Sequence, residues 1–144
     1  MTRLDENINN QTGSTQTKLN PLEKSLLAAI TSSDKIGDFY MMFKDSEILV
    51  LGQGREEKPD AFYLRYIEYE NQVTIPVFSS LFALKQYIDQ ESSYSAISVQ
   101  ELLAIADPSA SLLLNPGTTL TKLFVKKELE MLRTGEIIRL FQGK

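Results

Sequence analysis

Residues 112–119 read Leu-Leu-Leu-Asn-Pro-Gly-Thr-Thr and join an apolar run to a strong turn signal. The leucine run predicts a short buried strand. Pro116 and Gly117 fill the two central positions that a type II turn prefers, because proline presets φ and glycine tolerates a positive φ. The sequence therefore predicts a buried strand that ends in a tight turn.

More strands are predicted before this turn. Residues 48–51 form an apolar, β-branched run closed by glycines, which is typical of a strand buried on both faces. Residues 61–69 and 72–78 are β-rich runs around Glu70-Asn71, and they predict a hairpin. Pro76 lies inside the second run and cannot donate to a ladder, so we expect it at a sheet edge or a bulge. Residues 95–99 predict another short strand.

About four helices are predicted. Asn20-Pro21-Leu22-Glu23 combines an N-cap, an N-terminal proline and a capping-box acid, so a helix begins there and runs to about residue 34. Ser79 or Ser80 caps a second helix, with Leu81, Leu84 and Ile88 on one face. The remaining helix signals are a capping box at Ser98–Glu101, with a stop at Asp107-Pro108, and residues 126–134, with Leu129 and Leu132 inward and Gly135 as the stop.

Residues 38–43 fit either a helix or a strand, and residues 137–141 fit either a final strand or a helical extension. Strands and helices alternate without an internal repeat, so the class is α/β or α+β, with a mixed sheet flanked by the helices. We expect residues 19–144 to form one compact domain. Residues 1–18 are rich in Thr, Asn and Gln and predict a disordered polar tail.

Histidine, cysteine and tryptophan are absent from all 144 residues. Without histidine and cysteine, Ser-His and Cys-His nucleophilic pairs, thiol redox chemistry and standard zinc sites are excluded. We therefore expect neither catalysis nor a metal or cofactor. The net charge of −4 and the absence of a Lys/Arg cluster argue against nucleic acid. No apolar run or signal-peptide core suggests a membrane or export, so a cytoplasmic protein is expected.

Four segments resemble one bacterial family. Residues 20–29 (Asn-Pro-Leu-Glu-Lys-Ser-Leu-Leu-Ala-Ala) are similar to the opening of the SseB (enhanced serine sensitivity) N-terminal domain. Residues 75–80, 98–103 and 113–117 resemble later elements of that family, in the same order. The resemblance spans about residues 19–134 and implies a fold and structural motifs, without an established activity that could be transferred to these residues.

Residues 115–119 form the first candidate binding site. Backbone amides from Gly117 to Thr119 could form an anion-binding nest, to which Thr118 and Thr119 add hydroxyls, beside Asn115. A plain type II turn also accounts for every residue of this segment and is the favoured reading. An enzyme would instead need a buried carboxylate or lysine with a strongly shifted pKa near this turn.

The second candidate is an aromatic face. Tyr63, Arg65, Ile67 and Tyr69 alternate onto one side of the predicted hairpin, and such a patch is typical of interfaces. A helix packed over the same face is the competing interpretation. The carboxylates in residues 56–60 and 68–70, and the Gly52-Gln53-Gly54 segment, are better explained as solvated surface and as a strand exit.

The sequence thus favours a non-catalytic binding or regulatory module that contacts another protein of unknown identity. A homodimer is left open. A small acidic secretion chaperone or a toxin-immunity protein is the alternative, and it would bind a basic neighbour in a salt-sensitive way. A small-molecule-binding domain is a weaker third reading.

Overall fold

A computed structural model describes residues 18–54, 62–88 and 93–142; of residues 53, 54, 62 and 63 only the backbone is described. The predicted tail therefore lies outside the described residues, apart from Lys18. The helices of the described residues are α1 (Pro21–Thr31), the 3₁₀ helix η1 (Ser33–Lys35), α2 (Ile36–Lys44), α3 (Leu81–Tyr87), α4 (Val99–Ile105), α5 (Lys126–Thr134) and α6 (Glu136–Gln142). Both ambiguous segments are helical, so the described residues contain six α-helices instead of about four.

The strands form one mixed sheet. They are β2 (Glu47–Gly54), β3 (Phe62–Leu64), β4 (Ile67–Tyr69), β5 (Gln72–Phe78), β6 (Tyr94–Ser98), β7 (Ser111–Leu114) and β8 (Lys122–Phe124). The order is β3-β2-β5-β7-β8, with β4 paired to β5 and β6 to β2. All pairs are antiparallel except β5 with β7. The α/β class and the mixed sheet are confirmed, while β8 was not predicted.

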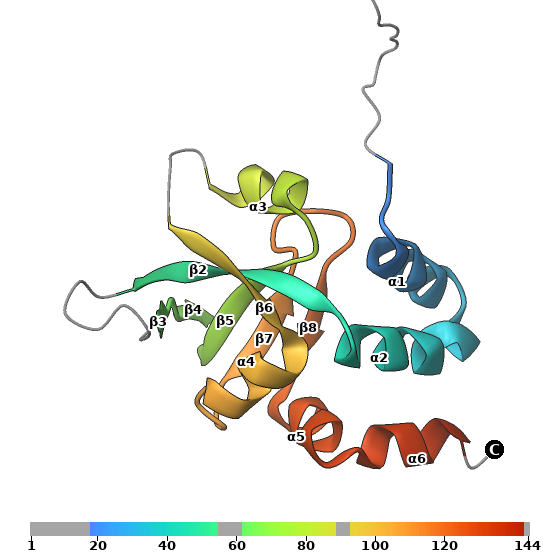
Figure 1. Cartoon of the computed structure of the whole chain (residues 1–144). Coiled ribbons are helices and arrows are strands. Elements are labelled where there is room, and N and C mark those ends of the chain that lie inside the picture. Colours follow the sequence, from blue (N-terminus) through green and yellow to red (C-terminus); the bar gives the residue numbers. More distant parts are fainter. Residues whose placement is uncertain (1–17, 55–61, 89–92, 143–144) are drawn as a thin grey trace, which may run out of the picture.

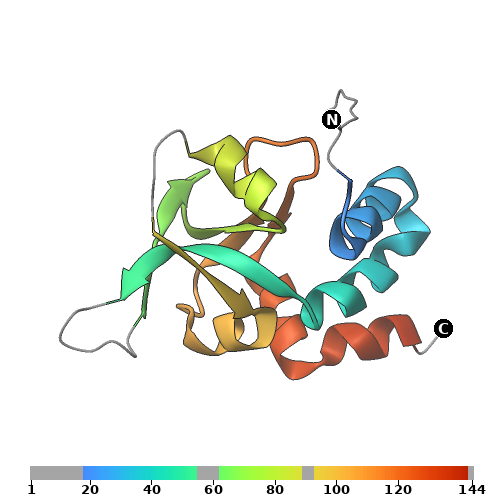
Figure 2. The same cartoon turned by 45° about the horizontal axis from the view of Figure 1, so that its top comes forward.

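The helices lie on the two faces of the sheet unequally (Figures 1 and 2). In Figure 1, α3 lies above the sheet and α4 and α5 lie below it, with α1, α2 and α6 gathered at one side. The larger core contains Ile48 and Val50 of β2. Leu51 of the same strand packs in a smaller cluster with Phe78 of β5 and Leu84 of α3. Alternate residues of β2 thus serve opposite faces, as predicted for a strand buried on both sides.

The predicted hairpin is correct only in its second half. β4 and β5 pair around Glu70 and Asn71, whose φ angles of 51° and 65° suit a type I′ turn. The expectation of one strand over residues 61–69 is wrong, because β3 pairs with β2 while β4 pairs with β5. β2 and β5 themselves pair at only two positions, so the chain between β3 and β4 crosses from one strand to the other.

Pro76 lies in a central strand, so the expected edge or bulge position is wrong. The carbonyl of Val77 accepts from Asn115 N on the β7 side, at 2.8 Å. Successive residues alternate in direction, so the imide nitrogen of Pro76 faces the other side. There β4 pairs only up to Thr74 and β2 begins at Val77. The N–H that proline lacks would therefore point to the position where pairing with β4 ends and pairing with β2 begins.

Candidate functional site

Ser79, which directly follows β5, joins the start of α1 to the turn at Asn115 through hydrogen bonds. Its backbone N donates to Asn115 Oδ1 at 2.9 Å, and its hydroxyl accepts from Asn115 Nδ2 at 2.8 Å. The same hydroxyl donates to Glu23 Oε2 at 2.6 Å, and the carbonyl of Ser79 accepts from Asn20 Nδ2 at 2.9 Å. We call these four residues the Ser79 cluster.

The Ser79 cluster also builds the N-terminus of α1. Asn20 Oδ1 accepts from Glu23 N at 2.8 Å, and Glu23 Oε1 accepts from Asn20 N at 2.9 Å. The predicted capping box is therefore confirmed. Glu23 is buried, and both of its carboxylate oxygens are used by Asn20 and Ser79. One cap thus fixes the helix and ties it to the sheet at the same time.

The Asn115 turn is the third part of this cluster. Asn115 is 2% exposed and has a φ of 55°, and its Nδ2 also donates to Leu120 O at 3.1 Å. Thr118 N donates to the Asn115 carbonyl at 3.3 Å and Gly117 has a φ of 81°, so the predicted type II turn is confirmed. Thr118 Oγ1 donates to the same carbonyl and accepts from Leu120 N. These groups are committed to the fold, while Thr119 is exposed.

Three of the four segments that suggested a family, around residues 20–23, 79 and 115–117, thus meet in one hydrogen-bonded cluster. The profile of the SseB protein N-terminal domain matches residues 22–131, which is most of the chain. The chain belongs to the SseB N-terminal domain family. Searches among curated proteins and among solved structures gave no match. Membership in the SseB family confirms the resemblance, and the Ser79 cluster gives the shared motifs a common structural role.

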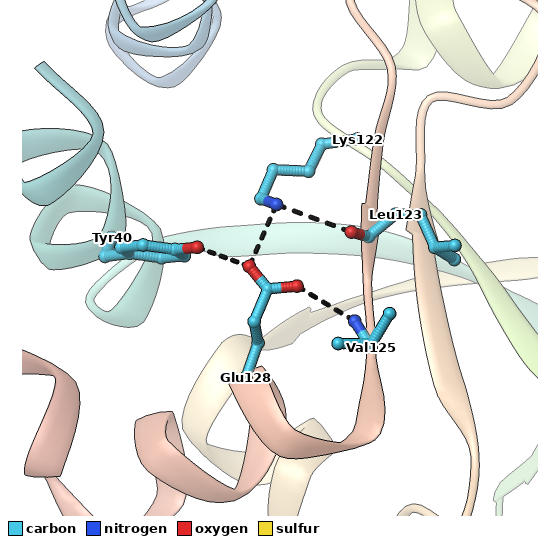
Figure 3. A network of polar contacts seen from close by, with 5 residues as sticks. All are labelled: Tyr40, Lys122, Leu123, Val125 and Glu128. Atoms are coloured by element: carbon cyan, nitrogen blue, oxygen red, sulfur yellow. Dashed lines mark hydrogen bonds and ion pairs between the residues drawn. The ribbon is translucent and has the colours of Figure 1, made fainter. Parts of the chain in front are cut away.

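A second polar network, which the sequence analysis missed, joins α2, β8 and α5 (Figure 3). The Tyr40 hydroxyl donates to Glu128 Oε2, which also pairs with Lys122 Nζ at 2.9 Å. Glu128 Oε1 accepts from Val125 N at 2.9 Å, so the same carboxylate caps α5. Lys122 Nζ lies 4.9 Å from the centre of the Phe124 ring, within the range of a cation–π contact.

The Tyr40 phenol in this network is held in its neutral form. Burial, followed by the hydrogen bond to Glu128 and the charge of Glu128, raises the pKa of Tyr40 well above its usual value. A phenol with such a raised pKa is poorly suited to act as a general base near neutral pH. The network instead links α2 to α5 through one shared carboxylate.

A hollow of about 340 Å³ lies beside the Ser79 cluster, between α3 and β6. Its lining includes Glu47 and Leu49 of β2, the segment Ser79–Leu81, and Tyr94 and Ala96 of β6. Leu81 is 41% exposed and Tyr94 46% exposed. Leu81 and Leu84 were predicted to lie on one face of their helix; Leu84 is buried, whereas Leu81 borders the hollow. We call this region the α3–β6 surface.

The predicted aromatic face is divided between two strands. Tyr63 lies on β3 opposite Gln53, and its side chain is outside the described part of the chain. Tyr69 lies on β4 opposite Gln72 and is half-buried, while Arg65, between the strands, is exposed. The prediction assumed one continuous strand, whereas the chain ends β3 and begins β4 within this segment. The alternation of these residues therefore does not define a single face.

The described residues contain no group of three or more acidic side chains arranged to hold a metal ion. Within the same described residues, no helix has both the length and the apolar character needed to cross a membrane.

Proposed function

We propose that this SseB-family domain is a non-catalytic binding module that acts through protein contact, and that the α3–β6 surface makes the contact. The observation that carries the proposal is an uncharged strand edge beside an apolar hollow. β6 reads Tyr-Ser-Ala-Ile-Ser and, among the described residues, pairs with β2 alone. Sheet edges are usually protected by charge, proline or a covering element.

Among the described residues, β3, β4, β6 and β8 each pair with a single strand. β3, β4 and β8 have three residues each, whereas β6 has five residues and no charged side chain. A longer, neutral edge offers its main-chain N–H and C=O groups to an added strand, and the hollow next to it can take an apolar side chain. These two features together favour an extended protein segment as the occupant.

The polar clusters support a role without catalysis. Both oxygens of Glu23 accept bonds within the Ser79 cluster, and both oxygens of Glu128 accept bonds from Tyr40, Lys122 and Val125. A general base must lie within hydrogen-bond reach of the proton that it takes from a substrate. These carboxylates are engaged with the chain itself, so they are better suited to hold the fold than to move a proton.

Affinity capture with matched variants tests the proposal. Wild-type protein, Ala96→Lys and the control Val73→Lys are used as baits in lysate of the source organism. Val73 is 50% exposed on β5, whereas Ala96 lies on the proposed contact. We expect wild type and V73K to capture one partner in stoichiometric amount, and A96K to lose it. An untagged copy of the chain itself counts as a partner.

A partner retained by A96K would place the contact elsewhere and overturn the proposed surface. No partner with any bait would overturn protein contact and leave a small molecule in the hollow as the next hypothesis. Loss of the partner from wild type at high salt would favour the chaperone or immunity alternative, because screening weakens an interface based on charge.

A further inference from the structure

We propose that the occupant of the α3–β6 surface is a second copy of the chain. The two β6 strands would pair antiparallel about a two-fold axis at Ala96 and extend the sheet from one molecule into the other. This inference rests on the proposed function and names its partner. It follows from the direction of the β6 main-chain groups, the symmetry of the strand and the side chains of the hollow.

The hydrogen bonds at the two ends of β6 establish which groups face outward. Gly52 N donates to Ser93 O at 3.1 Å, and Val99 N donates to Ser46 O at 3.0 Å. Odd-numbered residues of this strand therefore direct their main-chain groups to β2. Because direction alternates along a strand, Tyr94, Ala96 and Ser98 direct theirs to the open edge.

A two-fold axis at the central residue of β6 pairs the strand with a reversed copy of itself. With the axis at Ala96, this residue faces its own copy, and Tyr94 faces Ser98 of the second copy. The carbonyl of Ser98 already serves the first turn of α4 as an N-cap. The Ala96 pair and the two Ser98-to-Tyr94 bonds then give about four intermolecular main-chain hydrogen bonds. Small residues at positions 95, 96 and 98 allow the two backbones to approach.

The side chains of the hollow fit this arrangement. Tyr94, Ala96 and Ser98 are paired with Leu51, Leu49 and Glu47 of β2, so all six share one face of the sheet. In the dimer, Tyr94 of the second copy lies next to Ser98, with Glu47 one strand further along the same row. Its phenol can extend over the small serine, place its ring on the hollow and donate to the Glu47 carboxylate.

The hydrogen-bonding groups of the hollow suit this occupant. Among the described residues, Glu47 is the one formally charged residue of the lining, and it is exposed. A carboxylate only accepts hydrogen bonds, so the Tyr94 hydroxyl of the second copy can donate to it. Two copies supply this donor to each other at the same time, since a two-fold interface uses the same patch twice.

A single cysteine tests the register directly, because the natural chain contains none. Facing residues of a hydrogen-bonded antiparallel pair have Cα atoms about 5.5 Å apart, which suits a disulfide. We expect Ala96→Cys to form a covalent dimer under mild oxidation far faster than the control Val73→Cys. Equal rates for the two variants would overturn the proposed register.

Analytical ultracentrifugation of proteins without the added cysteine completes the test. Wild type is expected to change from monomer to dimer as its concentration rises. Ala96→Pro is expected to remain monomeric with a nearly unchanged Tm, because position 96 donates no bond to β2. Ala96→Lys provides the same readout if the proline variant folds poorly. If wild type stays monomeric up to its solubility limit, the proposal that a second copy occupies the surface is overturned. If wild type then still captures a different protein that A96K loses, the proposed function stands.

Discussion

Replacing Asn115 with alanine is expected to destabilise the domain by about 4 kcal/mol, and it separates a structural role of this turn from a ligand-binding one. The side chain accepts from Ser79 N and donates to Ser79 Oγ and Leu120 O. Each such bond contributes about 1 kcal/mol, so their loss accounts for about 3 kcal/mol. Alanine at a φ of 55° adds about 1 kcal/mol, because the left-handed region disfavours a Cβ.

Asn115→Gly divides this value into its two parts. Glycine loses the same three hydrogen bonds but tolerates the positive φ, so we expect a loss of about 3 kcal/mol for N115G. Thr119→Ala is the control within the same predicted site. Thr119 is exposed, so its replacement is expected to change the free energy of unfolding by less than about 0.5 kcal/mol.

Urea unfolding followed by far-ultraviolet circular dichroism measures these differences, since the chain lacks tryptophan. The m value should stay constant, which shows that the compactness of the unfolded state is unchanged. A loss below about 1 kcal/mol for N115A would refute the role assigned to the hydrogen bonds. Equal losses for N115A and N115G would refute the contribution of the backbone conformation.

Three further substitutions test other parts of the fold. Tyr40→Phe removes the donor to Glu128 and is expected to cost about 1 kcal/mol near neutral pH. The folded-state pKa of Tyr40 is raised above 10.0, so this wild-type advantage is complete below about pH 10 and declines as the pH rises further; a difference in Tm that does not vary with pH contradicts it. Gly37→Ala places a Cβ 2.8 Å from ring atoms of Phe141, so thermal unfolding should show a loss of about 1 to 3 kcal/mol as α6 is displaced. Gly135→Ala meets no atom within 4 Å but has a φ of 82°, so a loss of about 1 kcal/mol is expected, and a loss below about 0.5 kcal/mol would argue against backbone strain at this position.

Features that depend on a few neighbouring residues were predictable from the sequence. The Asn20 capping box, the end of α5 at Gly135 and the type II turn after β7 were all predicted and are confirmed. The capping box predicted at Ser98–Glu101 is only half formed, because Ser98 Oγ accepts from Glu101 N but the Glu101 carboxylate accepts from the Ser98 hydroxyl instead of from its backbone N. A cap or a turn satisfies backbone groups within three or four residues, so its chemistry is written in consecutive letters.

Short apolar segments were decided by their neighbours. Residues 38–43 are helical as part of α2, which packs Phe39 and Phe43 against Phe124 of β8. β8 itself is only three residues long and gave no signal of its own. Intrinsic preferences over so few residues are weak, so tertiary packing selects between helix and strand.

The sequence by itself determined the α/β class, the caps, the turns and the exclusion of histidine and cysteine chemistry. Only the tertiary structure decided that residues 62–64 pair with β2, that Pro76 is central, and that Glu23, Ser79 and Asn115 form one cluster. It also decided that the open edge of β6 lies beside the α3–β6 hollow. Local hydrogen bonding is set by neighbouring residues, whereas strand order and shared surfaces arise from contacts between residues far apart in the chain, which no local pattern encodes.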